Sequence, residues 1–158
     1  MYRLRPLPPG LAGRVRCFVQ LTGLHDGPVV PVPIWQVARQ LGWAIWYRPL
    51  EGAHAALVSW CGYTALIVAD GIGLDEQRLA IAHEIGHLIA GHPPATELAR
   101  HPWFYWRAER EADLVALHLL CPPPVWQETQ SLEEVAATCA VPLHLLRKSV
   151  VSTRQEVC

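Results

Sequence analysis

His83-Glu84-Ile85-Gly86-His87 reads H-E-x-x-H, with two histidines four residues apart. Four residues are close to one turn of an α-helix, so both imidazoles would project from the same helical face and could bind one metal ion. Glu84 would lean over the edge of that face, where its carboxylate can take a proton from water. These five residues therefore predict a helix-borne zinc site with its own catalytic carboxylate.

The residues on either side of this motif predict a helix over about residues 75–90. Asp75 and Glu76 place negative charge in its first turn, where the helix dipole favours it, and apolar residues then recur at intervals of three and four. Gly91, followed by Pro93-Pro94, is a stop signal. Both histidines thus fall within the helix, where the one-turn spacing applies. The alternative is a pair of hydrogen-bonded core histidines with an exposed glutamate between them.

The segment Glu109-Arg110-Glu111-Ala112-Asp113 holds the candidates for a third metal ligand. A catalytic zinc site needs three protein ligands and one open position. Glu109 and Asp113 are one turn apart on a second predicted helix, at about residues 107–120, so both can face the first helix. We favour Glu109 as the ligand and Asp113 as the acceptor of an N–H from a zinc-bound histidine, with Glu111 pointing away. The alternative is a charged, solvated helix start with no part in the site.

The predicted loop between the two helices offers further polar and aromatic residues. His92 and His101, each beside a proline, are rival third ligands. The aromatic run at residues 103–106 is better explained by core packing or by a covering flap than by chemistry. Hydrolysis of an amide also needs a donor that stabilises the oxyanion. The sequence leaves four candidates open for this donor: His101, Tyr105, Arg107 and His118.

Composition and charge restrict the class of protein. The 158 residues suit one domain with its own core, and a formal net charge of −1 provides no general attraction to nucleic acid or to membrane. The five cysteines are odd in number and lack a C-x-x-C pair, which favours free thiols in a reducing compartment. The N-terminus has no apolar signal core, and no stretch suits a membrane span. We therefore expect a cytoplasmic protein with no direct nucleic-acid binding and no membrane association.

Proline and glycine divide this single domain, residues 1–158, into three parts. We expect an irregular N-terminal segment at residues 1–30, a core at 31–122 and a C-terminal helical segment at 125–158. Whether residues 14–21 form a strand or a helix is left open by their pattern. The other predicted elements are a helix at 34–41, strands at 43–48, 55–60 and 63–69 with a tight turn at Cys61-Gly62, a capping box at Ser131 and Glu134, and a last helix at 143–151.

Two longer runs around these motifs resemble the signatures of the ImmA/IrrE family of metallopeptidases. Residues 78–92, RLAIAHEIGHLIAGH, are similar to the first signature. Residues 109–122, EREADLVALHLLCP, are similar to the second, in which Glu, two variable residues, Ala and Asn or Asp lead to a Leu-Leu-x-Pro ending. The chain departs from this pattern at Val115, where Phe is common, and at His118, where a polar or acidic residue is usual. With the order of the other parts, the resemblance covers roughly residues 30–150.

The resemblance implies an α+β, zincin-like fold of the gluzincin type, with a small mixed or antiparallel sheet packed on the metal-binding helices and a C-terminal helical segment. It implies that His83, His87 and Glu109 bind zinc, with Mn²⁺ as an alternative metal, and that Glu84 is the general base. The strand at residues 63–69 would be the edge strand along which a peptide substrate lies, since an edge offers N–H and C=O groups for pairing.

Two functions follow from this resemblance and from the motif. The first is a zinc-dependent endopeptidase that cleaves a protein substrate, namely a helix-turn-helix transcriptional repressor of a mobile element or of a stress response. The second is a metal-bound interaction module that sequesters a repressor or toxin without cutting it. Replacement of Glu84 by glutamine separates the two, because only the first function needs a general base.

Overall fold

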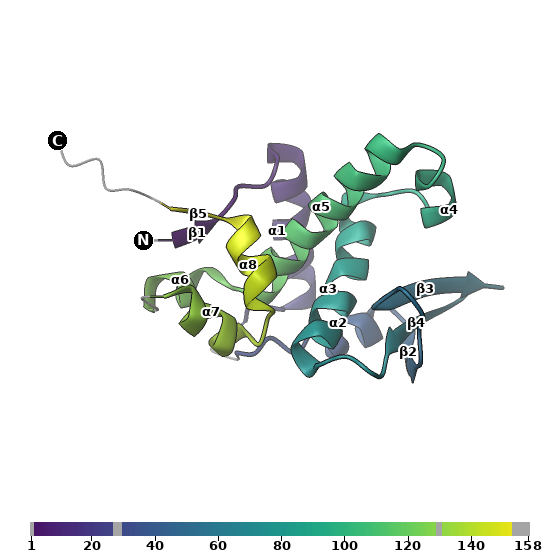
Figure 1. Cartoon of the computed structure of the whole chain (residues 1–158), viewed down its shortest axis with the longest axis horizontal. Coiled ribbons are helices and arrows are strands. Elements are labelled where there is room, and N and C mark those ends of the chain that lie inside the picture. Colours follow the sequence, from purple (N-terminus) through teal and green to yellow (C-terminus); the bar gives the residue numbers. More distant parts are fainter. Residues whose placement is uncertain (1, 27–29, 129–130, 153–158) are drawn as a thin grey trace.

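Two long helices, α3 (Leu74–Ala90) and α5 (Pro102–Leu120), pack against each other at the centre of the structure (Figure 1). This computed structural model describes residues 2–26, 30–128 and 131–152. α3 matches the predicted metal-binding helix. It carries acidic residues in its first turn and ends at Gly91, whose φ of 69° lies in the left-handed region that favours glycine.

α5 begins at Pro102, five residues before the start that the sequence pattern predicted at about residue 107. Pro102 occupies its first turn, where a proline is well tolerated because the missing N–H would have no helical partner. The aromatic run at residues 103–106 is therefore helical rather than part of a loop. Only the short helix α4 (Ala95–Leu98) remains between α3 and α5.

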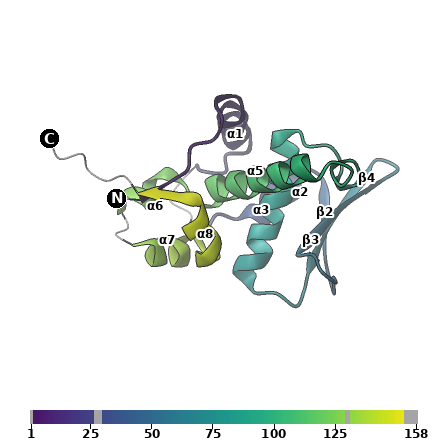
Figure 2. The same cartoon turned by 45° about the horizontal axis from the view of Figure 1, so that its top comes forward.

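A three-stranded mixed sheet lies at one end of the helices, with the order β2-β4-β3 (Figures 1 and 2). The strands β2 (Trp43–Arg48), β3 (Ala55–Trp60) and β4 (Tyr63–Ala69) have the predicted positions. β2 pairs with β4 in parallel and β3 pairs with β4 antiparallel. The helices α2 (Ile34–Gln40) and α3 pack against this sheet. The fold is thus α+β with a small mixed sheet, as predicted.

The expectation that residues 63–69 form an edge strand is wrong. β4 is the central strand, with Leu66 and Val68 fully buried, and β3 is the edge strand that packs near α3. β3 and β4 are joined by the predicted tight turn, in which Cys61 has a φ of 47° and Gly62 a φ of 80°. The hairpin pattern predicts that two strands pair, but it does not say which of them a third strand will join.

The prediction of an irregular segment at residues 1–30 is wrong for most of its described residues, whereas residues 1 and 27–29 lie outside the described part of the chain. β1 (Tyr2–Leu4) pairs antiparallel with β5 (Val150–Ser152), so segments near the two ends of the chain lie side by side. α1 (Pro9–Thr22) follows, with its proline in the first turn and with Leu11 and Val15 buried. The abundance of Pro and Gly in this segment misled the prediction, because these residues begin a helix here rather than prevent one.

The C-terminal segment lies at the end of α5 away from the sheet (Figures 1 and 2). Its described residues form α6 (Pro123–Glu128), α7 (Leu132–Cys139) and α8 (Leu143–Ser149) before β5, and residues 129–130 and 153–158 of the predicted helical segment lie outside the described part of the chain. The predicted capping box is confirmed, because Ser131 and Glu134 exchange side chain and backbone hydrogen bonds at the start of α7. The predicted last helix is too long, since residues 150–152 form strand β5 instead.

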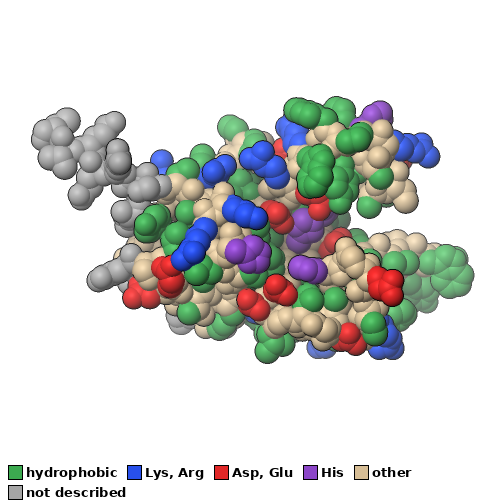
Figure 3. Space-filling view, in the orientation of Figure 1, with side chains coloured by type: hydrophobic (Ala, Val, Ile, Leu, Met, Phe, Trp, Pro, Cys, Tyr) green, Lys and Arg blue, Asp and Glu red, His purple; other side chains and the backbone are tan. Residues whose placement is uncertain are grey.

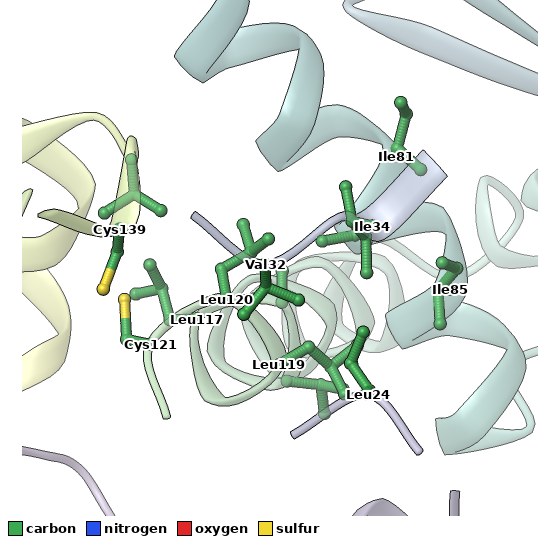
Figure 4. Packing of buried hydrophobic residues seen from close by; sticks show 14 of the residues in the cluster. Leu24, Val32, Ile34, Ile81, Ile85, Leu117, Leu119, Leu120, Cys121 and Cys139 are labelled. Atoms are coloured by element: carbon green, nitrogen blue, oxygen red, sulfur yellow. The ribbon is translucent and has the colours of Figure 1, made fainter. Parts of the chain in front are cut away.

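The core is built mainly from the second half of α5 and the helices around it. Figure 4 shows Leu117, Leu119 and Leu120 packed among aliphatic side chains from other segments, and all three are fully buried. Ile81 and Ile85 of α3 belong to the same cluster, so the core holds α3 and α5 together. Among the described residues, no helix is both long and apolar enough to cross a membrane.

Candidate metal centre

The side chains of His83, His87 and Glu109 meet where α3 and α5 cross. His83 Nε2 lies 3.0 Å from His87 Nε2 and 3.4 Å from Glu109 Oε2, and His87 Nε2 lies 3.3 Å from Glu109 Oε1. In Figure 3, histidine and acidic side chains gather in the hollowed middle of the molecular face. The structure thus brings Glu109 of α5 to the two histidines of α3, and this group could hold a metal ion.

Gly86 explains how the two helices come close enough. A Cβ atom at this position would lie 2.7 Å from the carbonyl oxygen and 3.1 Å from the Cα of Ala112. Any larger residue would therefore push against the backbone of α5, and the helices would have to move apart. Gly86 lies between His83 and His87, and Ala112 lies between Glu109 and Asp113. The close contact of these two small residues therefore brings both halves of the candidate site together.

The spacing of the three groups fits a tetrahedral zinc ion. With bond lengths of about 2.0–2.2 Å, two ligand atoms of such an ion are roughly 3.3 Å apart. The separations of 3.0, 3.3 and 3.4 Å lie around this value, and all three ligand atoms lie within 4.8 Å of one another. Two nitrogens and a carboxylate oxygen are also the donor set that a catalytic zinc site commonly uses, with a further position open.

His83 is oriented by Asp113. The Nδ1–H of His83 donates to Asp113 Oδ1 over 2.8 Å, which leaves Nε2 directed at His87 and Glu109. Burial alone would lower the pKa of His83, but the hydrogen bonds to Asp113 and Glu109 outweigh it and raise this pKa to about 9. The interactions with His83, above all, and with His87 in turn lower the pKa of Glu109 to about 2. Asp113 thus has the contact that the sequence predicted for it.

His87 is oriented by a series of hydrogen-bonded side chains that the sequence pattern did not predict. With Nε2 directed into the site, the Nδ1–H of His87 donates to His92 Nδ1 over 2.9 Å. His92 Nε2–H then donates to Glu111 Oε2 over 3.2 Å, and Arg107 Nε donates to Glu111 Oε1 over 2.9 Å. Burial lowers the pKa of His92, which suits the neutral ring that such a chain requires. His92 therefore contacts the far nitrogen of His87 and is not a member of the three-residue group. The prediction that Glu111 points away is wrong, because Glu111 accepts a hydrogen bond from His92.

The end of α3 places His92 there. After Gly91, the backbone N–H of His92 bonds to the carbonyl of His87, and the N–H of Gly91 bonds to the carbonyl of Leu88. This pair of bonds is the Schellman motif, which folds the chain back over the last helical turn. Gly91 is thus both a helix stop signal and the residue that brings His92 back to His87, and the sequence could have indicated this contact.

Glu84 lies close to the three-residue group. Burial raises the pKa of its carboxyl above the ordinary value of 4.5, and Glu109 adds to this effect, whereas the nearby charges of His83 and His87 oppose it. Glu84 thus holds its proton more tightly than an exposed glutamate does. This property suits a group that must accept a proton and then give it up.

The remaining sequence candidates have other surroundings. His118 lies in the second half of α5, and its Nε2 donates to the carbonyl of Arg5 over 3.0 Å, away from the three-residue group. His101 precedes α5, and its ring meets the edge of Phe104 with centroids 6.0 Å apart. The aromatic run is not core: Trp103, Phe104 and Trp106 are 70%, 55% and 67% exposed. Core packing is therefore the wrong explanation for these three residues.

Comparison with protein families and with curated proteins finds no match to this chain.

Proposed function

We propose that this protein is a zinc-dependent endopeptidase with a zincin-like fold. The observation that carries the proposal is the meeting of His83, His87 and Glu109 within 4.8 Å, with the carboxyl of Glu84 beside them. Zinc held there would lower the pKa of a water molecule toward neutrality and would polarise the carbonyl of a peptide bond.

Glu84 acts as the general base in this proposal. Its carboxylate accepts a proton from the attacking water and delivers the proton to the nitrogen of the leaving amine. The raised pKa of Glu84 supports both steps, because a base with a pKa nearer neutrality binds the proton more readily and still releases it. Asp113 keeps the ring of His83 in one tautomer, and the chain from His92 to Arg107 does the same for His87.

β3 is the strand to which a peptide substrate would pair. It is an edge of the sheet, it packs near α3, and no strand of the described chain pairs with its other edge. An extended peptide can therefore add to it through backbone hydrogen bonds, which recognise the peptide without regard to its sequence. The substrate class that the resemblance implies is a helix-turn-helix transcriptional repressor.

A single substitution tests the endopeptidase proposal. Glu84→Gln removes the base but keeps the size and shape of the side chain. We expect the zinc-loaded variant to bind zinc as the wild type does and to lose peptide cleavage by at least about 100-fold. Cleavage would be followed by mass spectrometry on a library of unstructured peptides and on a helix-turn-helix repressor protein. Glu76→Gln, in the first turn of the same helix, is the matched control and should leave cleavage unchanged.

The outcome also separates the endopeptidase from the binding module. Equal cleavage by wild type and Glu84→Gln would overturn the role of Glu84. If neither protein cleaved any peptide but both bound the repressor in a zinc-dependent way, the non-cleaving module would replace the endopeptidase. If the wild type bound no zinc while keeping its fold, both functions would fail.

A further inference from the structure

A cavity of about 480 Å³ opens beside the candidate metal centre. It lies between the short helix α4 and the first half of α5, and it is closed on a third side by the turn after α3. Its volume falls in the range of pockets that hold a small molecule or a large side chain, roughly 300–1,000 Å³. None of the proposed catalytic steps uses this cavity.

The cavity shares a wall with the candidate metal centre. His92 and Glu111 line it, and these residues form the chain that orients His87. On α5, Ala108 lines the cavity immediately before Glu109 in the sequence. A peptide whose backbone lay across the three-residue group could therefore place a neighbouring side chain in the cavity.

The lining has the chemistry of a site for an aromatic ring. Leu98 and Ala108 provide an apolar floor and are only 6% and 3% exposed. The ring of Phe104 and the imidazoles of His92 and His101 add flat aromatic surfaces, against which another ring can pack edge to face or stacked. Two guanidinium groups at the lining can also lie over an aromatic face, those of Arg100 and Arg107.

Charge argues against a charged occupant. The lining carries both signs of charge, Arg100 and Arg107 beside Glu97 and Glu111, so a charged side chain of either sign would meet like charges as well as opposite ones. Arg107 and Glu111 are already paired over 2.9 Å, so a charged occupant would disturb this ion pair without replacing it. An uncharged ring avoids both costs.

We propose that this cavity is a specificity pocket that receives an aromatic side chain of the substrate, next to the bond that is cut. The inference rests on the proposed endopeptidase function, which it extends by naming a substrate preference. The pocket makes the enzyme select peptides with Phe, Tyr or Trp beside the cleavage site.

Binding of small amides tests the pocket without relying on catalysis. N-acetyl-L-phenylalanine amide would be titrated into the full chain, with and without zinc, and followed by NMR, beside the leucine, glutamate and lysine amides. We expect the phenylalanine amide to bind with a dissociation constant on the order of 1 mM and to bind more tightly than the other three. Phe104→Ala, at an exposed position, should weaken it roughly three- to tenfold.

Two further variants control the experiment. Trp106→Ala removes an exposed ring of the same helix that does not line the cavity, and it should leave binding unchanged. Ala108→Leu fills the cavity from its buried wall and should abolish binding while the protein keeps its fold by circular dichroism. Equal binding by wild type, Phe104→Ala and Ala108→Leu, or tighter binding of the glutamate or lysine amide, would overturn the pocket.

The result distinguishes the pocket from the enzyme on which it rests. Binding of the phenylalanine amide by a protein that cleaves no peptide would support the pocket as a site for an aromatic group and would count against the endopeptidase. Cleavage of library peptides with no preference for aromatic residues near the cut would support the endopeptidase and overturn the specificity role of the pocket.

Discussion

The first and second halves of α5 are both rich in large apolar residues, but their surroundings are opposite. In the first half, Trp103, Phe104 and Trp106 are more than half exposed. In the second half, Leu117, Leu119 and Leu120 are completely buried (Figure 4). The hydrophobicity of a residue therefore does not decide its burial along this helix. The two halves differ in whether other helices and strands pack over them.

Glu109 and Asp113 lie where the two halves of α5 meet. On their C-terminal side, residues 115–120 of α5 belong to the core, which holds the helix in place. On their N-terminal side, α5 lines the cavity and has exposed aromatic rings. Ala112, between the two acids, is the residue that Gly86 of α3 touches. The buried half of α5 therefore fixes the positions of the carboxylates, whereas the exposed half leaves large apolar side chains open to solvent.

The largest effect should come from a matched pair of substitutions, one in each half of α5. Leu119→Ala would leave a cavity in the core and should lower the free energy of unfolding by about 2–5 kcal/mol. Trp103→Ala, which removes an even larger side chain from the exposed half, should change it by less than about 0.5 kcal/mol. Urea denaturation of the two variants measures both values. Similar losses would mean that the halves do not differ in stability as their burial suggests.

The contact between α3 and α5 should be the next most sensitive feature. Gly86→Ala places a methyl group against the backbone of Ala112, so we expect a loss of about 1–3 kcal/mol in stability together with weaker zinc binding. Gly13→Ala, in α1, is the control, because a Cβ there meets nothing within 4 Å. That substitution should stabilise the protein by about 0.4–1 kcal/mol, since alanine favours a helix. If Gly86→Ala were also stabilising, the close approach of the helices would not be required.

Asp113 should matter to zinc binding far more than to folding. Asp113→Ala removes the acceptor that orients His83, and we expect zinc affinity to fall about 10- to 100-fold in a competition assay with a chromophoric chelator. Asp70→Ala, which removes an exposed acid after β4, should leave the affinity unchanged. If Asp113→Ala bound zinc with unchanged affinity, the contact between Asp113 and His83 would not contribute to the metal site.

His92 should have a smaller effect of the same kind. His92→Ala removes the acceptor for His87 Nδ1, although a water molecule could take its place, so we expect zinc affinity to fall about tenfold. The absorption spectrum of the cobalt-loaded protein should also change, because the ring of His87 would turn. His144→Ala, an exposed histidine on α8, is the control. A cobalt spectrum identical to that of the wild type would contradict an orienting role for His92.

The smallest effect should be the release of a proton from His83 when zinc binds. Zinc requires a neutral imidazole, but the interactions with Asp113 and Glu109 raise the pKa of His83 in the metal-free protein to about 9, so both ring nitrogens are protonated at pH 7.5 and the ring is positively charged. Binding should release roughly one proton from His83 at this pH, and the release should fade as pH rises through 9. Calorimetry in two buffers of different ionisation enthalpy measures this number. A release from His83 that did not depend on pH would contradict the raised pKa.

The same shift makes the stability of the metal-free protein depend on pH. The pKa of His83 is higher in the folded chain than its ordinary value of 6.5, so its charge stabilises the fold fully below pH 6.5. This stabilisation is lost as pH rises through about 9. Denaturation of the chelator-treated protein at pH 6.5 and 9.5 should therefore show a decrease in the free energy of unfolding.

The local features of this chain could be predicted from its residues. The one-turn spacing of His83 and His87 follows from the geometry of any helix, and so does that of Glu109 and Asp113. The limits of α3, the turn at Cys61-Gly62 and the capping box at Ser131 also depend on residues that are near one another in the sequence. Such features are governed by backbone geometry and by short-range hydrogen bonds, which a sequence pattern describes well.

The long-range features depended on the tertiary structure. β4 is the central strand because β2 pairs with one of its sides and β3 with the other. The rings of Trp103, Phe104 and Trp106 are more than half exposed because the described helices and strands cover little of this part of α5. Glu111 faces His92 because the turn after α3 brings His92 back toward α5. Each of these depends on which segments meet in space. Residues far apart in the chain meet through the packing of whole elements, and no spacing within a short stretch of sequence contains that information.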